Sequence, residues 1–455
     1  MIRNYLNSGK TVFSLNLNLR LSLIYLISLS TMFLVIFLPA TITMASNEPS
    51  EAEYSTKYSV PIHNLENTVS AAILIDAKSG QVIYAYQPDT RLPIASTTKV
   101  MTALLVLEQA ALNSPVVISD NAVRVEGTRV YLEPRESQTV ENLLYASLLN
   151  SANDSATALG EYLGQGSKDT FAMMMNQRAA SIGVTNTNFT NATGLTEDNH
   201  YSTARDMALI AREAMRIPKF REIVSTRTHP WVGEKYQSSL VNLNRLLWTY
   251  PGITGIKTGY TKAAKNCLIA SAQRDGQELI SVVLGGGGDI WEQAATLLDY
   301  GFDRFAPAIL VNQGQIITNL DLKDQRQVAL LASRSLQVSL PRGREVLPQS
   351  QISINSDFKL PLSAGTQIGE ITYEIEGQSL EPIPLILAED VSKKKSILYQ
   401  AARVGICLIL LVYIFWRFLI QPRRMFYRQN RRKKRLPYNR QYSKEPLLYI
   451  NRDRQ

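Results

Sequence analysis

The sequence predicts an α+β protein in which an antiparallel sheet packs against a cluster of helices, followed by a smaller β-rich region. Short apolar runs typical of strands occur both between residues 71 and 86 and after residue 250. Helical stretches fill the interval between about 140 and 215. Strands at both ends with helices between them are typical of a sheet that packs on a helical layer.

The elements of this fold follow in chain order. A β-hairpin is expected first, because a polar segment ending in Gly80 separates two apolar runs. A helix is expected to begin near Ser96, where Pro93 precedes an apolar, helix-forming run. Three more strands close the region, with a turn at Asp275-Gly276 between the last two. The expected strands are 71–75, 82–86, 253–258, 267–273 and 279–284.

The pattern changes after Phe305. Few helical signals follow, and Ile371, Tyr373 and Ile375 alternate with polar residues as in a half-buried strand. A glycine turn would lead into another strand near 384–387. The expected boundaries are a linker over 46–62, a first folded domain over 63–305 and a β-rich domain over 310–390.

An apolar segment precedes these domains. Residues 21–40 carry no charge and follow three basic residues, which is the arrangement of a signal peptide. Cleavage before Ser46 is favoured, although twenty apolar residues also suffice to span a bilayer. Residues 1–45 are therefore interpreted as a signal peptide or an N-terminal membrane segment.

A second apolar segment, residues 396–420, is expected to form a transmembrane helix. Its uncharged core of thirteen residues, 404–416, would by itself suit a buried core helix. Basic residues flank it on both sides, and Arg403 and Arg417 can reach toward lipid headgroups. Because the more basic flank stays in the cytoplasm, the tail over 421–455 is expected there, with the folded domains on the other side of the membrane.

The formal net charge of +9 does not indicate a nucleic-acid-binding protein. The tail holds twelve Lys or Arg against two acidic residues, so the rest of the chain is nearly neutral. Tyrosines interleave with these basic residues, as in some RNA-binding segments. A basic segment beside a membrane helix is more typical of attraction to anionic lipid, about 1 kcal/mol per basic residue. We therefore expect membrane lipid as a partner and no nucleic acid.

Several kinds of chemistry are disfavoured by the sequence. Two cysteines, Cys267 and Cys407, allow at most one disulfide. Three histidines without a C-x-x-C or H-E-x-x-H motif argue against a zinc site, and we expect no metal and no cofactor. The absence of G-x-S-x-G leaves a Ser-His-Asp hydrolase poorly supported.

A serine can instead be activated by a lysine. Ser96 and Lys99 stand at positions i and i+3 of the expected helix and share a face. A lysine amine removes a hydroxyl proton only when it is neutral, and burial or a second cation lowers its pKa toward that state. S-x-x-K recurs at Ser356 and Ser392, but only Ser96 follows a proline and leads an apolar helical run.

Two further motifs follow in order, S-x-N at 151–153 and K-T-G at 257–259. In acyl transfer the Ser151 hydroxyl can relay a proton to the leaving amine, and the Asn153 amide can hold the substrate peptide. A K-T-G edge strand can pair with an extended peptide while its lysine supplies positive charge. Its glycine leaves room for the approaching substrate backbone. This order of motifs is that of penicillin-binding proteins and class A β-lactamases.

Residues 60–390 resemble the D-alanyl-D-alanine carboxypeptidases, the low-molecular-mass penicillin-binding proteins of serine peptidase family S11. The similar segments include A-S-T-T-K-V-M-T around Ser96, L-L-N-S-A-N-D around Ser151 and G-I-K-T-G-Y-T around Lys257. N-F-T-N-A-T-G-L and H-Y-S-T-A-R-D-M-A lie between 188 and 208. The resemblance implies a penicillin-binding/β-lactamase-like transpeptidase domain, the family's C-terminal β domain and a membrane-associated C-terminus.

The resemblance also implies an activity. The chain would be a serine D,D-carboxypeptidase on the outer face of a bacterial cell membrane, acting on peptidoglycan stem peptides that end in D-Ala-D-Ala and binding β-lactam antibiotics covalently. Ser96 would be the nucleophile, Lys99 its general base and Ser151 part of the proton relay. The backbone N–H groups of Ser96 and Tyr260 would form the oxyanion hole. The implied substrate-binding residues are Asn153, Lys257, Thr258, Gly259 and Tyr260.

Two departures and two alternatives stay open at this point. Many relatives have glycine where this chain has Lys265, and some carry an arginine near Gly287, which leaves open how carboxylate binding is completed. A class A-like β-lactamase would share the motifs, but no glutamate between 154 and 256 stands in an E-x-x-L-N pattern. A non-catalytic wall-associated scaffold protein is the other alternative, and the intact motif residues argue against it.

Overall fold

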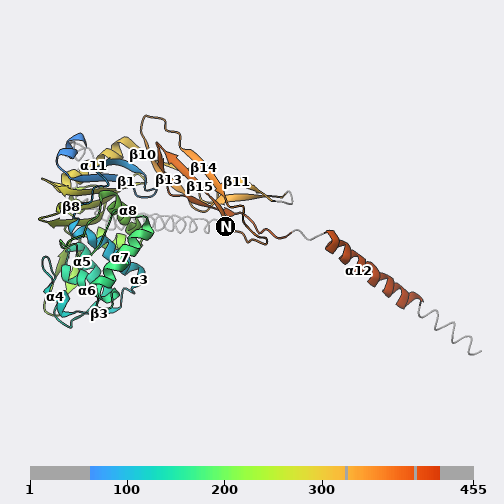
Figure 1. Ribbon diagram of the computed structural model, residues 1–455, viewed down its shortest axis with the longest axis horizontal. Helices are drawn as coiled ribbons and strands as arrows, with labels where there is room; N and C mark the ends of the chain where they lie inside the picture. The colour runs from blue at the N-terminus through green and yellow to red at the C-terminus, as the bar shows by residue number, and fades with distance from the viewer. Residues whose placement is uncertain (1–61, 323–325, 394–396, 421–455) are drawn as a thin grey trace, which may run out of the picture. The chain divides into compact units, whose positions relative to one another are not determined.

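The computed structural model describes residues 62–322, 326–393 and 397–420 (Figure 1). The α+β class predicted from the sequence is confirmed. The helices are α3 (Lys99–Gln109), α4 (Asp120–Arg124), α5 (Val140–Leu149), α6 (Asn153–Leu163), α7 (Lys168–Ile182), α8 (Ala204–Met215), α9 (Pro218–Ser225), α10 (Leu246–Thr249), α11 (Ile290–Arg304) and α12 (Ile397–Phe415), with the 3₁₀ turns η1 (Ile62–Asn67) and η2 (Ala95–Thr98) and the π-helical turn η3 (Trp416–Ile420). The strands are β1 (Ala71–Asp76), β2 (Val82–Tyr86), β3 (Pro115–Val117), β4 (Ser137–Thr139), β5 (Thr228–Val232), β6 (Gln237–Val241), β7 (Ile253–Thr261), β8 (Lys265–Arg274), β9 (Gln277–Gly286), β10 (Phe305–Val311), β11 (Ile316–Asp321), β12 (Gln327–Ala332), β13 (Leu336–Pro341), β14 (Gln349–Ile354), β15 (Gln367–Ile375), β16 (Gln378–Ser379) and β17 (Ile383–Leu387).

The main sheet is antiparallel and has the strand order β2-β1-β9-β8-β7. It contains all five predicted strands, and the predicted hairpin is the pair β1–β2. Every residue of β9 is buried, because helices cover both faces of the sheet. Ile73 and Ile280 belong to the core shared with the helical cluster. Leu74 and Leu279 lie on the opposite face, close to Gly301 of α11. This arrangement leaves β7 as an edge strand.

Helix α3 runs through the helical cluster, and its residues from Lys99 to Val106 are buried. The helix predicted to begin near Ser96 starts with a 3₁₀ turn. Ser96 lies in the 3₁₀ turn η2, and the α-helix begins at Lys99. The backbone of Ala95, with φ of +47°, does not have helical geometry. The Lys99 N–H donates to the Ser96 carbonyl, the tighter bonding pattern of a 3₁₀ turn.

The β-rich region begins with β10, which pairs with β13. A second sheet has the order β11-β12-β17-β15-β14, with β16 paired to β15. The strand predicted from alternation is β15, where Ile371 and Ile375 are buried in the core and Tyr373 is half-buried. The strand predicted near 384–387 is β17, whose buried and half-buried residues alternate.

Polar contacts join this region to the main sheet through Ser339 on β13. The Ser339 N–H donates to the Gln81 side chain at 3.0 Å, and its hydroxyl donates to the Asp76 carboxylate at 2.6 Å. The Gln277 amide in turn donates to the Ser339 hydroxyl at 2.8 Å. All four side chains are buried, so each depends on the others for its hydrogen bonds.

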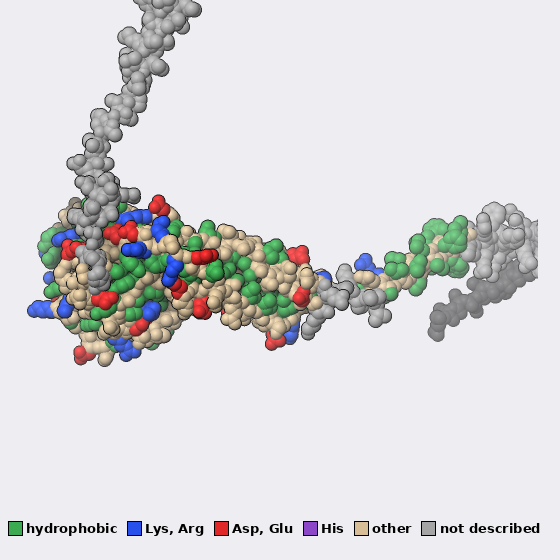
Figure 2. Space-filling model, turned by 90° about the horizontal axis from the view of Figure 1, so that it is seen from above, with side chains coloured by type: hydrophobic (Ala, Val, Ile, Leu, Met, Phe, Trp, Pro, Cys, Tyr) green, Lys and Arg blue, Asp and Glu red, His purple; other side chains and the backbone are tan. Residues whose placement is uncertain are grey.

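Helix α12 is long and apolar enough to span a membrane, which agrees with the predicted segment over 396–420. The candidate span is Tyr399–Leu419, with 21 residues and a mean hydropathy of 2.0, and none of it is buried against the protein. Its exposed hydrophobic side chains are visible in Figure 2. The predicted export segment over 1–45, the linker up to residue 61 and the basic tail over 421–455 lie outside the described residues.

Candidate active site

The turn that carries Ser96 is held in a strained shape between two glycines. Ala95, just before Ser96, has a positive φ, which is costly for a residue with a side chain. A Cβ on Gly194 would lie 1.8 Å from the Ala95 carbonyl oxygen, and a Cβ on Gly259 would lie 2.9 Å from the Ser96 nitrogen. Only glycine fits at both positions, so the turn is packed from two sides.

Lys99 follows one turn later and faces Ser96, as the i and i+3 spacing predicts. Its Nζ atom lies 2.9 Å from the Ser96 hydroxyl oxygen. Two more oxygens surround the amine at 2.7 Å each, the side-chain oxygen of Asn153 and the backbone carbonyl of Thr193. A neutral amine has two N–H groups and one lone pair. When the two N–H groups donate to the Asn153 side-chain oxygen and the Thr193 carbonyl, the lone pair faces the Ser96 hydroxyl.

The surroundings of Lys99 favour that neutral form. The residue is fully buried, and this burial is the main cause that holds its pKa well below the usual range. The nearby cation of Lys257 lowers the pKa further, while the buried carboxylate of Asp154 opposes both effects. Burial and a second cation, the two causes expected from the sequence, both act on Lys99.

The S-x-N motif lies between α5 and α6. Ser151 is buried and has a φ of +60°, and Asn153 begins α6. The Asn153 amide bridges two parts of the site, because its oxygen accepts from Lys99 and its nitrogen donates to the Glu126 carbonyl at 2.6 Å. Asp154 accepts the N–H groups of Val130 and Leu132, which fixes the loop before the motif.

The K-T-G motif lies on the edge strand β7, as the sequence predicts. Lys257 is 1% exposed, and its amine donates to the Thr258 carbonyl at 3.0 Å. Burial lowers the pKa of Lys257 to about 7. Tyr260 is 66% exposed at the end of the motif. Gly259 lies against the Ser96 turn, because a Cβ at this position would lie 2.9 Å from the Ser96 nitrogen.

Sequence reasoning missed several residues that complete the site. They lie between α7 and α8, in a segment whose sequence resembles the family but for which no catalytic role was predicted. Asn191 accepts the N–H groups of Thr193 and Gly194 at 3.1 and 2.7 Å, which orients the Thr193 carbonyl toward Lys99. His200 contacts the Thr98 hydroxyl at 2.8 Å. No side-chain motif indicated that a backbone carbonyl would bind the lysine.

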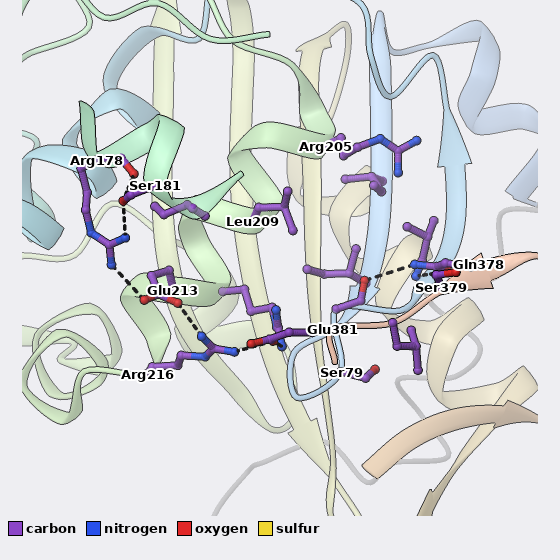
Figure 3. A pocket seen from close by; sticks show the side chains of 17 residues that line it. Ser79, Arg178, Ser181, Arg205, Leu209, Glu213, Arg216, Gln378, Ser379 and Glu381 are labelled. Atoms are coloured by element: carbon purple, nitrogen blue, oxygen red, sulfur yellow. Dashed lines mark hydrogen bonds and ion pairs between the residues drawn. The ribbon is translucent and has the colours of Figure 1, made fainter. Parts of the chain in front are cut away.

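A cavity of about 470 Å³ lies away from these motifs, where α7 and α8 approach β1, β2 and β16 (Figure 3). Ion pairs run through it from Arg178 to Glu213 and from Glu213 to Arg216. Arg212 and Arg216 of the first domain also pair with Glu381 of the β-rich domain, and we interpret the cavity as part of a polar clamp between the two domains. The guanidinium groups that share the Glu381 carboxylate are those of Arg212, Arg216 and Arg334.

No group of three or more His, Cys, Asp or Glu side chains that could hold a metal ion occurs in the described ranges. Cys267 is buried and unpaired, with its sulfur 3.6 Å from the Ala264 carbonyl. His229 stacks on Tyr145 with ring centroids 3.7 Å apart.

Enzymes that recognise penicillin through an acylated serine share this order of motifs. Residues 57–288 match the peptidase S11 family, described as D-alanyl-D-alanine carboxypeptidase, and residues 305–393 match the penicillin-binding protein 5 C-terminal domain. The chain therefore belongs to the D-alanyl-D-alanine carboxypeptidases of family S11, which are serine peptidases. The resemblance seen in the sequence is confirmed.

Individual relatives agree with this assignment. The chain is 32% identical to D-alanyl-D-alanine carboxypeptidase DacF of Bacillus subtilis over 354 residues, which cover 75% of this chain and 90% of that protein. It is 31% identical to DacC of Escherichia coli, over 71% of this chain and 84% of that protein. The structure of penicillin binding protein 5 from Haemophilus influenzae matches with a TM-score of 0.60 and 28% identity, over 72% of this chain and 98% of that one.

Proposed function

We propose that this protein removes the terminal D-alanine from peptidoglycan stem peptides ending in D-Ala-D-Ala, through an acyl-enzyme on Ser96. The observation that carries the proposal is the buried Lys99 amine, 2.9 Å from the Ser96 hydroxyl and in contact with two other oxygens. Membership of the D-alanyl-D-alanine carboxypeptidase family supports the choice of substrate.

In the acylation step, the Ser96 hydroxyl donates its proton to the neutral Lys99 amine while its oxygen attacks the carbonyl of the penultimate D-alanine. The backbone N–H groups of Ser96 and Tyr260 stabilise the resulting oxyanion. The C–N bond then breaks, and the leaving D-alanine takes a proton through Ser151. Water hydrolyses the acyl-enzyme and restores the Ser96 hydroxyl. β-Lactams enter by the same attack and remain attached to Ser96.

The remaining motif residues bind the substrate. β7 lies at the edge of the sheet and can form backbone hydrogen bonds with an extended peptide, which then pairs with it as an added strand. Lys257 and Thr258 steer the terminal carboxylate, and Asn153 holds the peptide beside Lys99. A carboxylate bound near Lys257 would raise the pKa of that lysine and keep it cationic.

The proposal is tested with the full chain in detergent. The wild type should release D-alanine from a peptide ending in D-Ala-D-Ala, and Ser96→Ala should not. Ser356→Ala is a matched control, because it removes an S-x-x-K serine from the exposed surface of the β-rich region. Release of no D-alanine by a folded wild type would refute the carboxypeptidase proposal.

The two alternatives give different results in a second measurement. A carboxypeptidase should keep a penicillin adduct on Ser96 for a long time, detectable as an added mass. A β-lactamase would turn over benzylpenicillin rapidly, and a non-catalytic scaffold protein would neither release D-alanine nor form the adduct. The family matches favour the first outcome.

We also propose that α12 anchors the protein, with the catalytic domain on the extracytoplasmic face and the C-terminal tail in the cytoplasm. The apolar span Tyr399–Leu419 supports the anchor, and the basic residues after it support the orientation. A single cysteine placed in the tail, in a Cys267→Ala and Cys407→Ala background, should resist a membrane-impermeant thiol reagent in intact cells. Labelling of that cysteine without lysis would reverse the orientation.

A further inference from the structure

A buried histidine links the loop that holds Lys99 to the turn that carries Ser96. His200 is 7% exposed and lies just before α8. One ring nitrogen, Nε2, lies 2.8 Å from the Thr98 hydroxyl, and the other, Nδ1, lies 3.1 Å from the Thr190 nitrogen. Thr98 stands between Ser96 and Lys99 in the chain, so this contact reaches the centre of the S-x-x-K motif.

The hydrogen bonds define which nitrogen of His200 carries the proton. The Thr190 backbone N–H can only donate, so Nδ1 must accept and carries no hydrogen. The single proton of the neutral ring is therefore on Nε2, where it is donated to the Thr98 hydroxyl oxygen. Burial lowers the pKa of His200 to about 4, a change that Lys168 reinforces and Glu197 opposes, so the ring is neutral at neutral pH.

The Thr97 hydroxyl donates to the Ile94 carbonyl at 2.6 Å within the Ser96 turn, but the turn has no side-chain cap. Neither the residue before η2 nor Thr98, which precedes α3, caps its helix with a side chain. The Ala95 backbone is strained, and its shape persists only if contacts around it hold it. The Thr98 hydroxyl contacts His200 instead of capping α3, and Gly194 packs closely beside both Ala95 and Thr98.

We propose that His200 is a positioning residue, whose Nε2–H bond to Thr98 holds the Ser96 turn so that the hydroxyl faces the lone pair of Lys99. The same loop supplies the Thr193 carbonyl that binds Lys99, so one segment orients both partners of the proton transfer. This inference rests on the proposed Ser96–Lys99 chemistry. His200 does not touch the reacting atoms and acts only through Thr98.

The competing interpretation is that His200 only fills the core. Its ring also contacts Phe189 edge to face, with centroids 5.9 Å apart. If His200 only fills the core, any side chain of similar shape should replace it without loss of activity. Two substitutions of His200 by amide side chains distinguish these interpretations. In His200→Gln the amide nitrogen can occupy the place of Nε2 and donate to Thr98. In His200→Asn the amide oxygen can occupy the place of Nδ1 and accept from Thr190, but nothing reaches Thr98.

The experiment compares His200→Gln, His200→Asn and His200→Leu in the full chain in detergent, with D-alanine release and the rate of penicillin acylation as readouts. Small displacements of reacting groups cost about 10²-fold for 1 Å. We expect kcat and the acylation rate constant to fall about 10- to 100-fold in the Asn and Leu variants, with KM within about threefold. We expect the Gln variant to keep rates within about fivefold of wild type. His229→Leu, which removes the stacked histidine outside the site, is the matched control.

A double-variant cycle tests the contact itself. Thr98→Val removes the hydroxyl at nearly constant volume from a residue that is fully buried. If the two side chains act through one bond, the His200→Leu, Thr98→Val double variant loses no more activity than the worse single variant. Losses that multiply in the double variant would overturn the proposal.

Two more results would overturn the inference. The first is equal activity in the Gln and Asn variants, and the second is an activity loss that only parallels a fall in Tm across all three variants. Both are distinct from failure of the proposed function, which a wild type that releases no D-alanine would reveal. If the wild type is active and the Asn variant is as active as the Gln variant, the proposed function stands and the positioning role of His200 is excluded.

Discussion

Gly259→Ala tests how closely the K-T-G strand must approach the nucleophile. The added Cβ would lie 2.9 Å from the Ser96 nitrogen and 3.1 Å from both the Ala95 Cβ and the Thr97 nitrogen. Relaxed contact begins near 3.4 Å, and the Ser96 and Thr97 atoms are backbone that cannot rotate away. The turn and β7 must therefore separate by about half an ångström. The new methyl would also crowd the Ser96 N–H, one of the two proposed oxyanion donors.

The expected loss follows from these two effects. Removal of one oxyanion donor costs about 10²–10³ in rate, and a displacement of this size adds to that loss. The second-order rate constant for acylation by labelled penicillin should therefore fall by about 10²-fold or more. Gly287→Ala is the control, because its Cβ would meet only the Thr68 carbonyl at 3.6 Å. Acylation of a folded Gly259→Ala variant within threefold of wild type would refute this account of the contact.

Three other substitutions test the energetics of the fold. Lys257→Met should abolish D-alanine release yet raise Tm at pH 7, because burial disfavours the charged lysine. The gain in Tm should shrink toward pH 10, where the lysine of the unfolded chain also loses its proton. A lowered Tm at pH 7 would contradict this expectation. Glu381→Gln should lower stability by about 1 kcal/mol, less in high salt, since three guanidinium groups share that carboxylate at a partly exposed site. An unchanged Tm in low salt would contradict the clamp. Leu104→Ala on α3 should cost about 2–5 kcal/mol in a thermal or denaturant melt, because the side chain is fully buried, and a loss below 0.5 kcal/mol would be inconsistent with that packing.

The sequence predicted those parts of the site that depend on residue type and spacing along the chain. Ser96 and Lys99 are one helical turn apart, so their contact needs no knowledge of the rest of the fold. The K-T-G strand was predicted at a sheet edge because an extended peptide needs free backbone groups, and β7 is the edge strand. The low pKa of Lys99 follows from an apolar helix and a second buried cation.

Other parts of the site depend on contacts between distant segments. The Thr193 carbonyl binds Lys99 from 94 positions away, and a backbone oxygen leaves no mark in a sequence. His200 has no neighbouring partner in the chain, so its bond to Thr98 is visible only once the loop is placed. The left-handed backbone of Ala95 was not predicted, because an alanine carries no signal for a positive φ.

The two buried lysines must carry different charges at the same pH, and a nearby cation lowers the pKa of Lys99 in addition to burial. Burial lowers both, but Lys99 also faces the cation of Lys257, which holds its pKa well below the usual range, while the pKa of Lys257 is lowered to about 7. The proposed mechanism needs Lys99 neutral and Lys257 protonated. In the free enzyme, kcat/KM should therefore fall as pH rises through about 7, because Lys257 loses its charge. A bound carboxylate raises the pKa of Lys257, so the alkaline limb of kcat should lie at higher pH than that of kcat/KM. Coincident alkaline limbs in the two profiles would show that Lys257 does not bind the substrate carboxylate.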